Sequence, residues 1–178
     1  MNYYKLIIAY DGTDYKGWQE QPNVPTITNA LLKSFKDIFC CQITIIGASR
    51  TDAGVHSLGQ TALAKTDLDL DAQILQNVWN KRLPSDIVIT CIERLDKNFN
   101  PMINVKEKTY FYNFYLQRPL PFNHRQTLFF YWKIDMDKLK ECLKIFVGTH
   151  DFRSFSSGHE MKSTIRTINE INLTPSSN

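Results

Sequence analysis

The sequence lacks the features of a membrane or secreted protein. No apolar run is long enough to cross a bilayer, and the first residues do not combine a basic stretch with an apolar one as a secretory signal does. We therefore expect a cytoplasmic protein with no membrane partner. The spacing of its few cysteines fits neither a zinc site nor a disulfide scaffold: Cys40, Cys41, Cys91 and Cys142.

Neither sign of charge is in strong excess. The formal net charge is +3, which permits a polyanionic partner but does not require one. Apolar residues make up 43% of the chain and charged residues 22%, as is typical of a folded globular protein. A length of 178 residues allows one sizeable core or two smaller ones.

The first part of the chain, residues 1–105, alternates strand and helix patterns. Apolar residues at helical spacing predict helices over 26–39 and 71–83, the first capped by Thr26 or Thr28. Alternating and β-branched residues predict strands over 3–10, 42–48, 56–65 and 86–92. The order β-α-β-β-α-β is that of a ferredoxin-like (RRM-like) unit with an antiparallel sheet, so we expect an α+β fold.

The remainder, residues 106–178, gives a shorter version of the same order. Aromatic and β-branched residues predict a strand over 106–116, followed by a helix over 135–147 and a strand over 164–173. We expect a second ferredoxin-like unit that is incomplete. The alternative is a single α+β domain in which the last strand joins the first sheet, since periodicity does not distinguish the two.

The connection between two predicted strands, residues 47–56 (GASRTDAGVH), places Arg50 and Asp52 between two glycines. Such connections commonly hold functional groups. On extended backbone, residues two apart face the same side, where the cation would favour the charged, nucleophilic form of the acid. The alternative is an Asx turn, in which Asp52 bonds its own backbone and Arg50 is solvated.

Asp11 and Asp14 form the other conspicuous pair of acids. They enclose Gly-Thr at the end of the first predicted strand, a composition more typical of a turn than of a metal site. We therefore predict no metal.

Several motifs follow one another in the order found in tRNA pseudouridine synthases of the TruA type, and the chain resembles that family along its whole length. The motifs are residues 10–13 (YDGT), 17–21 (GWQEQ), 50–56 (RTDAGVH), 59–60 (GQ), 83–87 (LPSDI), 108–110 (KTY), 148–152 (GTHDF) and 166–168 (RTI). The resemblance implies isomerisation of uridine to pseudouridine in the anticodon stem-loop of tRNA, without cofactor or metal. It also implies two ferredoxin-like halves with a basic central cleft, and a homodimer.

The resemblance assigns roles to three residues. Asp52 matches the catalytic aspartate, and Arg50 matches the arginine that helps to extrude the target base. Tyr110 matches the tyrosine expected to stack on the flipped uracil; its alternative role is core packing beside Tyr112 and Phe114. His56 fits a buried hydrogen-bonding residue as well as an RNA contact, so we assign it no catalytic role.

Scattered cations are candidates for phosphate contacts: Lys106, Lys108, Arg118, Arg125, Arg153, Lys162 and Arg166. The chain also departs from the family. Met102 stands where an arginine is common, and Ser49 where glycine is frequent. The family's closing segment, which leads into Met-Val-Arg, is absent. We expect a fragment of a longer enzyme; the alternative is a naturally short, catalytically impaired RNA-binding homologue.

Two other functions account for part of the sequence. A non-catalytic RNA-binding module would stack bases on the aromatic residues of 110–115, although the glycines of the usual RNA-recognition strand are missing there. A glycoside hydrolase would need a second carboxylate opposite Asp52, and none lies near it in the sequence.

Overall fold

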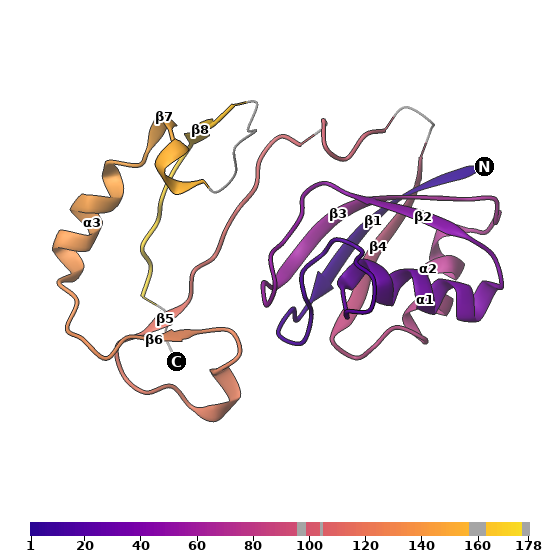
Figure 1. Ribbon diagram of the computed structural model, residues 1–178, viewed down its shortest axis with the longest axis horizontal. Helices are drawn as coiled ribbons and strands as arrows, with labels where there is room; N and C mark the ends of the chain where they lie inside the picture. Colours follow the sequence, from indigo (N-terminus) through magenta and orange to yellow (C-terminus); the bar gives the residue numbers. More distant parts are fainter. Residues whose placement is uncertain (96–98, 104, 157–162, 176–178) are drawn as a thin grey trace. The chain divides into compact units, whose positions relative to one another are not determined.

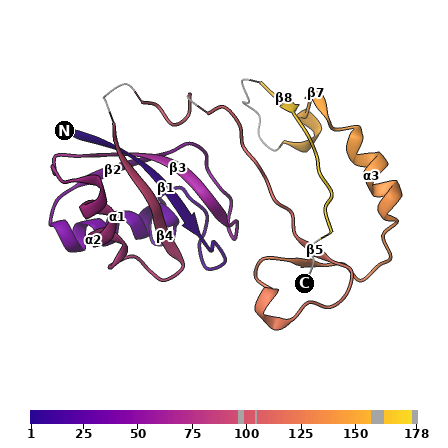
Figure 2. The ribbon, with the colours of Figure 1, turned by 180° about the vertical axis from the view of Figure 1, so that it is seen from behind.

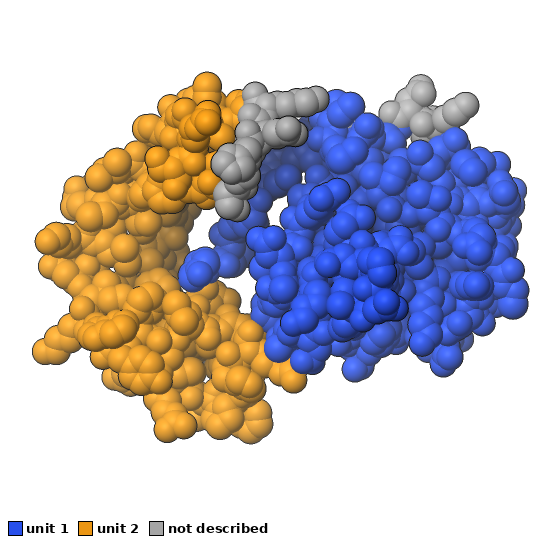
Figure 3. All heavy atoms as spheres, in the orientation of Figure 1, with its two compact units in different colours: residues 1–112 blue, residues 113–178 orange. Residues whose placement is uncertain are grey.

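The computed structural model describes residues 1–95, 99–103, 105–156 and 163–175, and the chain divides into two units (Figure 3). Unit 1 comprises residues 1–112 and unit 2 residues 113–178. Each is described separately below.

Unit 1 is a four-stranded antiparallel sheet with two helices on one face (Figures 1 and 2). Its elements are β1 (Asn2–Tyr10), α1 (Ile27–Phe39), β2 (Ile43–Gly47), β3 (Ser57–Thr66), α2 (Ala72–Asn80) and β4 (Ile87–Leu95). The strand order is β2-β3-β1-β4, so β1 lies between β3 and β4 and pairs with both. The predicted α+β class with an antiparallel sheet is confirmed.

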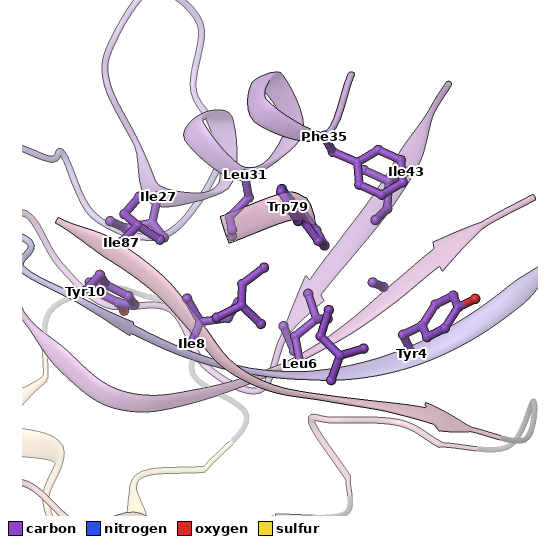
Figure 4. Close-up of a cluster of buried hydrophobic side chains, with 14 of the residues drawn as sticks. Tyr4, Leu6, Ile8, Tyr10, Ile27, Leu31, Phe35, Ile43, Trp79 and Ile87 are labelled. Atoms are coloured by element: carbon purple, nitrogen blue, oxygen red, sulfur yellow. The ribbon is translucent and has the colours of Figure 1, made fainter. Parts of the chain in front are cut away.

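Alternation along β1 builds the core of unit 1. Tyr4, Leu6, Ile8 and Tyr10 are buried and face the helices, while the residues between them are only half-buried (Figure 4). Every second side chain of a strand points to the same face, so this one strand supplies four core side chains.

Side chains of the two helices complete that core on the face of the sheet that the helices cover. Phe35 of α1 and Trp79 of α2 meet edge to face, with ring centroids 4.9 Å apart (Figure 4). The indole Nε1 of Trp79 donates to Ser34 Oγ at 2.9 Å, so the buried polar atom of this large ring is satisfied. This contact joins the two helices inside the core.

Side-chain caps set where both helices begin. Thr26 precedes α1, and its hydroxyl accepts from Asn29 N at 3.2 Å, one of the two predicted cap positions. Asp71 precedes α2 and accepts from the amides of Gln73 and Ile74 at 2.9 and 3.1 Å. These oxygens satisfy amides that have no partner within the helix.

The described residues of unit 2 form short elements (Figures 1 and 2). They are β5 (Phe114–Tyr115), η1 (Pro121–Asn123), β6 (Leu128–Phe129), α3 (Met136–Lys144), β7 (Gly148–Asp151), η2 (Arg153–Phe155) and β8 (Ile165–Ile168). β5 pairs with β6 in parallel, and β7 with β8 antiparallel. Because β8 pairs with β7, the alternative in which the last strand joins the first sheet is wrong.

The strand predicted over 106–116 is also wrong, since only Phe114 and Tyr115 form strand there. Tyr110, Phe111 and Tyr112 are 73 to 84% exposed. Aromatic residues favour strands when they can pack against neighbouring strands. Residues 110–112 lie outside every sheet that the structure describes, so this preference has no effect there. None of the described residues of unit 2 is buried.

Within the part of the chain that the structure describes, no helix combines the length and apolarity needed to span a membrane.

Replacing Trp79 by alanine should lower the free energy of unfolding by about 3 to 5 kcal/mol, because a fully buried indole leaves a cavity and Ser34 loses its donor. Urea unfolding measures the change. Ile74→Ala is the matched control on the same helix; its side chain is 53% exposed, and its effect should stay within about 0.5 kcal/mol. Equal losses in the two variants would contradict this account of the core.

Candidate active site

The loop between β2 and β3, residues 48–56, carries Asp52 and is attached to the segment that follows β1. Before Asp52, the Thr51 hydroxyl lies 2.9 Å from the Tyr10 hydroxyl. The Thr51 carbonyl accepts from the amide of Trp18 at 3.1 Å. Thr51 is therefore held by one side chain and one main-chain bond.

The chain after Asp52 is attached as well. The amide of Gly54 donates to the Tyr15 carbonyl at 3.1 Å, and the amide of Val55 donates to the Asp52 carbonyl at 3.2 Å. His56 Nδ1 lies 3.1 Å from Asp11 Oδ1. Both flanks of Asp52 are thus fixed to one neighbouring segment, residues 10–18.

Two glycines allow the two segments to approach closely. A Cβ at Gly12 would overlap the Val55 carbonyl, and one at Gly17 would overlap the Thr51 carbonyl. Gly17 also has a φ of +91°, a backbone conformation that residues with a side chain rarely adopt. The motifs YDGT and GWQEQ therefore have a structural function: they supply the backbone on which the Asp52 loop rests.

The segment that receives the loop is itself tied to the sheet. Asp11 donates its amide to the Asp86 carbonyl at 2.9 Å, next to the start of β4. The Tyr15 hydroxyl donates to Asp86 Oδ1 at 2.8 Å. Burial, followed by this bond to the carboxylate, raises the pKa of Tyr15 well above its ordinary value. Burial likewise raises the pKa of Tyr10, although its bond to Thr51 acts in the opposite direction.

Asp52 itself projects into solvent. Its side chain is exposed, and it makes no hydrogen bond or ion pair with any described residue. The Asx turn considered for Asp52 is not formed, because the turn is closed by its main-chain carbonyl and Val55. An exposed, unengaged carboxylate on an anchored backbone is available to a ligand.

Arg50 shares the loop and is also exposed. Among the described residues, the Arg50 guanidinium and Asp52 form no ion pair, so the expected effect of the cation on the acid is not supported by a direct contact. Arg50 lies at the end of a groove of about 440 Å³ that follows β2 and α1. Trp18, Glu20 and Met102 also line this groove.

Tyr110 lies on an extended segment, and its side chain is 83% exposed. It makes no hydrogen bond or ring contact with the Asp52 loop among the residues that the structure describes. The packing with Tyr112 and Phe114 on a strand face does not form either, because the strand begins only at Phe114. The role of Tyr110 therefore stays a prediction of the resemblance.

The candidate phosphate contacts are on the surface where they are described. Lys162 lies outside the described residues. The others are all exposed: Lys106, Lys108, Arg118, Arg125, Arg153 and Arg166.

Asp11 takes part in a turn, as its sequence context indicates. Its Oδ1 accepts from the amide of Thr13 at 3.0 Å. Across the described ranges, no three His, Cys, Asp or Glu side chains gather as metal ligands would. The contact of Asp11 with His56 was missed by sequence reasoning, because the two lie 45 positions apart and only the antiparallel pairing of β1 with β3 brings them together.

Comparison with known proteins gives a consistent result. A family model described as tRNA pseudouridine synthase matches residues 6–101 and 142–178. The chain is 39% identical over 170 residues to a tRNA pseudouridine synthase A of Thermodesulfovibrio yellowstonii, covering 95% of this chain and 67% of that protein. It is 38% identical over 171 residues to one of Acetivibrio thermocellus, covering 95% and 70%. It is 38% identical over 175 residues to tRNA pseudouridine synthase A 2 of Clostridium tetani, with the same coverage.

Gly17→Ala should destabilise unit 1 by about 1 to 3 kcal/mol, because it adds both backbone strain and a clash with the Thr51 carbonyl. Gly54→Ala is the matched control. Its φ of +79° is similarly unfavourable, but no atom lies within 4 Å of the added Cβ. Urea unfolding of both variants isolates the clash, and an equal loss of stability would show that the two segments are not in close contact.

The raised pKa values of Tyr10 and Tyr15 predict a loss of stability in alkali. The unfolded chain releases these protons near the ordinary pKa of 10.0, whereas the folded protein retains them, so the stabilisation is complete below that pH and declines above it. Tyr15→Phe should make the decline between about pH 9 and about pH 11 shallower than in the parent. Tyr131→Phe, at a side chain that is 80% exposed, is the control. Parallel declines in parent and Tyr15→Phe would refute the linkage.

Proposed function

The chain belongs to the tRNA pseudouridine synthases, and we propose that it isomerises uridine to pseudouridine in the anticodon stem-loop of tRNA. One observation carries the proposal most directly. Asp52, in the family's RTDAGVH motif, presents an exposed carboxylate on a loop whose two flanks are bonded to the segment after β1. No cofactor or metal is invoked.

The reaction suits a carboxylate. Asp52 can add to an electrophilic carbon of the nucleotide or stabilise a sugar cation, and it can leave again afterwards. The bond from the ribose to uracil N1 breaks, and a new bond forms from the ribose to uracil C5. The C5 proton passes to solvent, N1 gains a proton, and the enzyme returns to its starting state. The overall change is an isomerisation that needs no oxidant or reductant.

Arg50 and Tyr110 complete the proposed site. A guanidinium is planar, stacks on bases and pairs with phosphate, so Arg50 fits the role of occupying the place of the extruded base. Arg50 is exposed and lies two positions from Asp52 on the same loop. Tyr110 would stack on the extruded uracil, and its exposed ring permits this.

We also infer that unit 1 is a ferredoxin-like half, which its strand order and single helical face support. Residues 106–178 would form the counterpart half. The homodimer, the basic central cleft and the cytoplasmic location stay predictions of the family resemblance.

The test is release of tritium from tRNA that carries it at uracil C5. The parent should release tritium, and Asp52→Asn, which keeps the shape but not the charge, should reduce the rate by at least about 10³-fold. Asp69→Asn is the control, since Asp69 forms a surface pair with Arg94 in unit 1. Its rate should match the parent.

Two other outcomes have defined meanings. Release by Asp52→Asn at the parent rate would exclude Asp52 as the catalytic group. A parent that binds tRNA without releasing tritium would instead support the RNA-binding module, whose candidate surface is the exposed run Tyr110, Phe111 and Tyr112.

A further inference from the structure

We propose that Asp11 and His56 form a positioning pair that sets the direction of the Asp52 carboxylate during catalysis. The proposal rests on the proposed function. It concerns two residues that neither touch the reacting atoms nor carry an assigned role, and its evidence is the way in which the loop is held.

The two side chains lie close together and are partly buried, with 32% of His56 and 25% of Asp11 exposed. His56 Nδ1 lies 3.1 Å from Asp11 Oδ1, and the nitrogen is not accessible to solvent. A neutral imidazole carries one proton, on Nδ1 or on Nε2, and with the proton on Nδ1 this nitrogen would face the Asp11 carboxylate as a donor. A hydrogen-bearing nitrogen facing a carboxylate is an attractive contact, and it is stronger when water is excluded.

Asp11 is a fixed partner rather than a mobile surface acid. Its Oδ1 also accepts from the amide of Thr13 at 3.0 Å and from the Thr13 hydroxyl. Its own amide donates to the Asp86 carbonyl at 2.9 Å. Asp11 is therefore held in place by its bonds to Asp86 and Thr13, and its contact with His56 holds that side chain in turn.

His56 in turn fixes the end of the loop that carries Asp52. It stands directly before β3, and the preceding residue, Val55, donates to the Asp52 carbonyl at 3.2 Å. A shift of His56 therefore displaces the turn that aims the carboxylate. Since the Asp52 side chain bonds to no described residue, this backbone is what sets the position of its Cα–Cβ bond, from which the carboxylate reaches a ligand.

The Asp11–His56 contact holds the exit of the loop, and the Tyr10–Thr51 contact holds its entrance. A carboxylate that must reach one carbon atom of a bound nucleotide is sensitive to small displacements, and a misplacement of about 1 Å can cost about 10²-fold in rate. Loss of the pair should therefore slow the chemical step while leaving the binding of tRNA intact.

The experiment measures single-turnover tritium release with enzyme in excess over labelled tRNA. Under these conditions the rate of the bound complex does not depend on the fraction of enzyme that is folded. His56→Ala and Asp11→Ala should each be about 10- to 100-fold slower than the parent, with an unchanged Kd for tRNA. The double variant should be no slower than the slower single variant, because both changes remove the contact between the two side chains; Asp11→Ala also removes the bonds to Thr13, so it should be the slower of the two.

His56→Asn tests whether the contact itself matters, since its amide nitrogen can donate from nearly the same position as Nδ1. Its rate should recover to within about threefold of the parent, well above that of the alanine variant. The matched control is Glu93→Ala, which removes an exposed cross-strand pair with Lys5, at 3.0 Å, from the same sheet. It should leave the rate and the Kd unchanged.

Each result that would contradict the proposal can be told apart from the others. A parent rate in His56→Ala, or independent losses that multiply in the double variant, would overturn the pair as a positioning device. A weakened Kd with an unchanged rate would make His56 an RNA contact instead. A parent without turnover would reject the proposed function and this proposal with it.

Discussion

The attachment of residues 51–56 to residues 10–18 is the constraint on which the candidate site depends. Main-chain bonds from Trp18 and Gly54, together with the side-chain contacts of Tyr10 and His56, hold the loop on both sides of Asp52. The acid makes no such contact itself. The arrangement thus combines a fixed backbone with an unengaged carboxylate, as a nucleophile that must bond transiently with a ligand requires.

The core of unit 1 provides the support for this attachment. Tyr10 is the last buried side chain in the alternation along β1, and its hydroxyl reaches Thr51 of the loop. Tyr10 therefore connects the packed core of unit 1 directly to Thr51, the residue before Asp52. The Tyr10 hydroxyl can serve as donor or acceptor to Thr51, and burial raises its pKa above the ordinary value.

Much of unit 1 could be predicted from the sequence, because its signals are local. Alternation marks β1, helical spacing marks α1 and α2, and Thr26 and Asp71 mark where the helices begin. Asp52 was found from its motif, but its supports were not. Their bonds join residues about 40 positions apart, and only the pairing of β1 with β3 brings these together.

Residues 106–116 show where prediction from the sequence fails. The composition of these residues predicts a strand, yet only Phe114 and Tyr115 are part of a sheet, and the side chains of Tyr110, Phe111 and Tyr112 are exposed. Strand preference reports how well a residue packs against neighbours, so it is not realised where none are provided.

Amide hydrogen exchange of the Asp52 loop tests the central claim most directly. The amides of Trp18 and Gly54 join the two segments, so the account predicts that both exchange at least about 100-fold more slowly than in an unstructured chain. Exchange of these two amides at unstructured rates, while the β1 amides stay protected, would show that the loop is not held and would contradict the account.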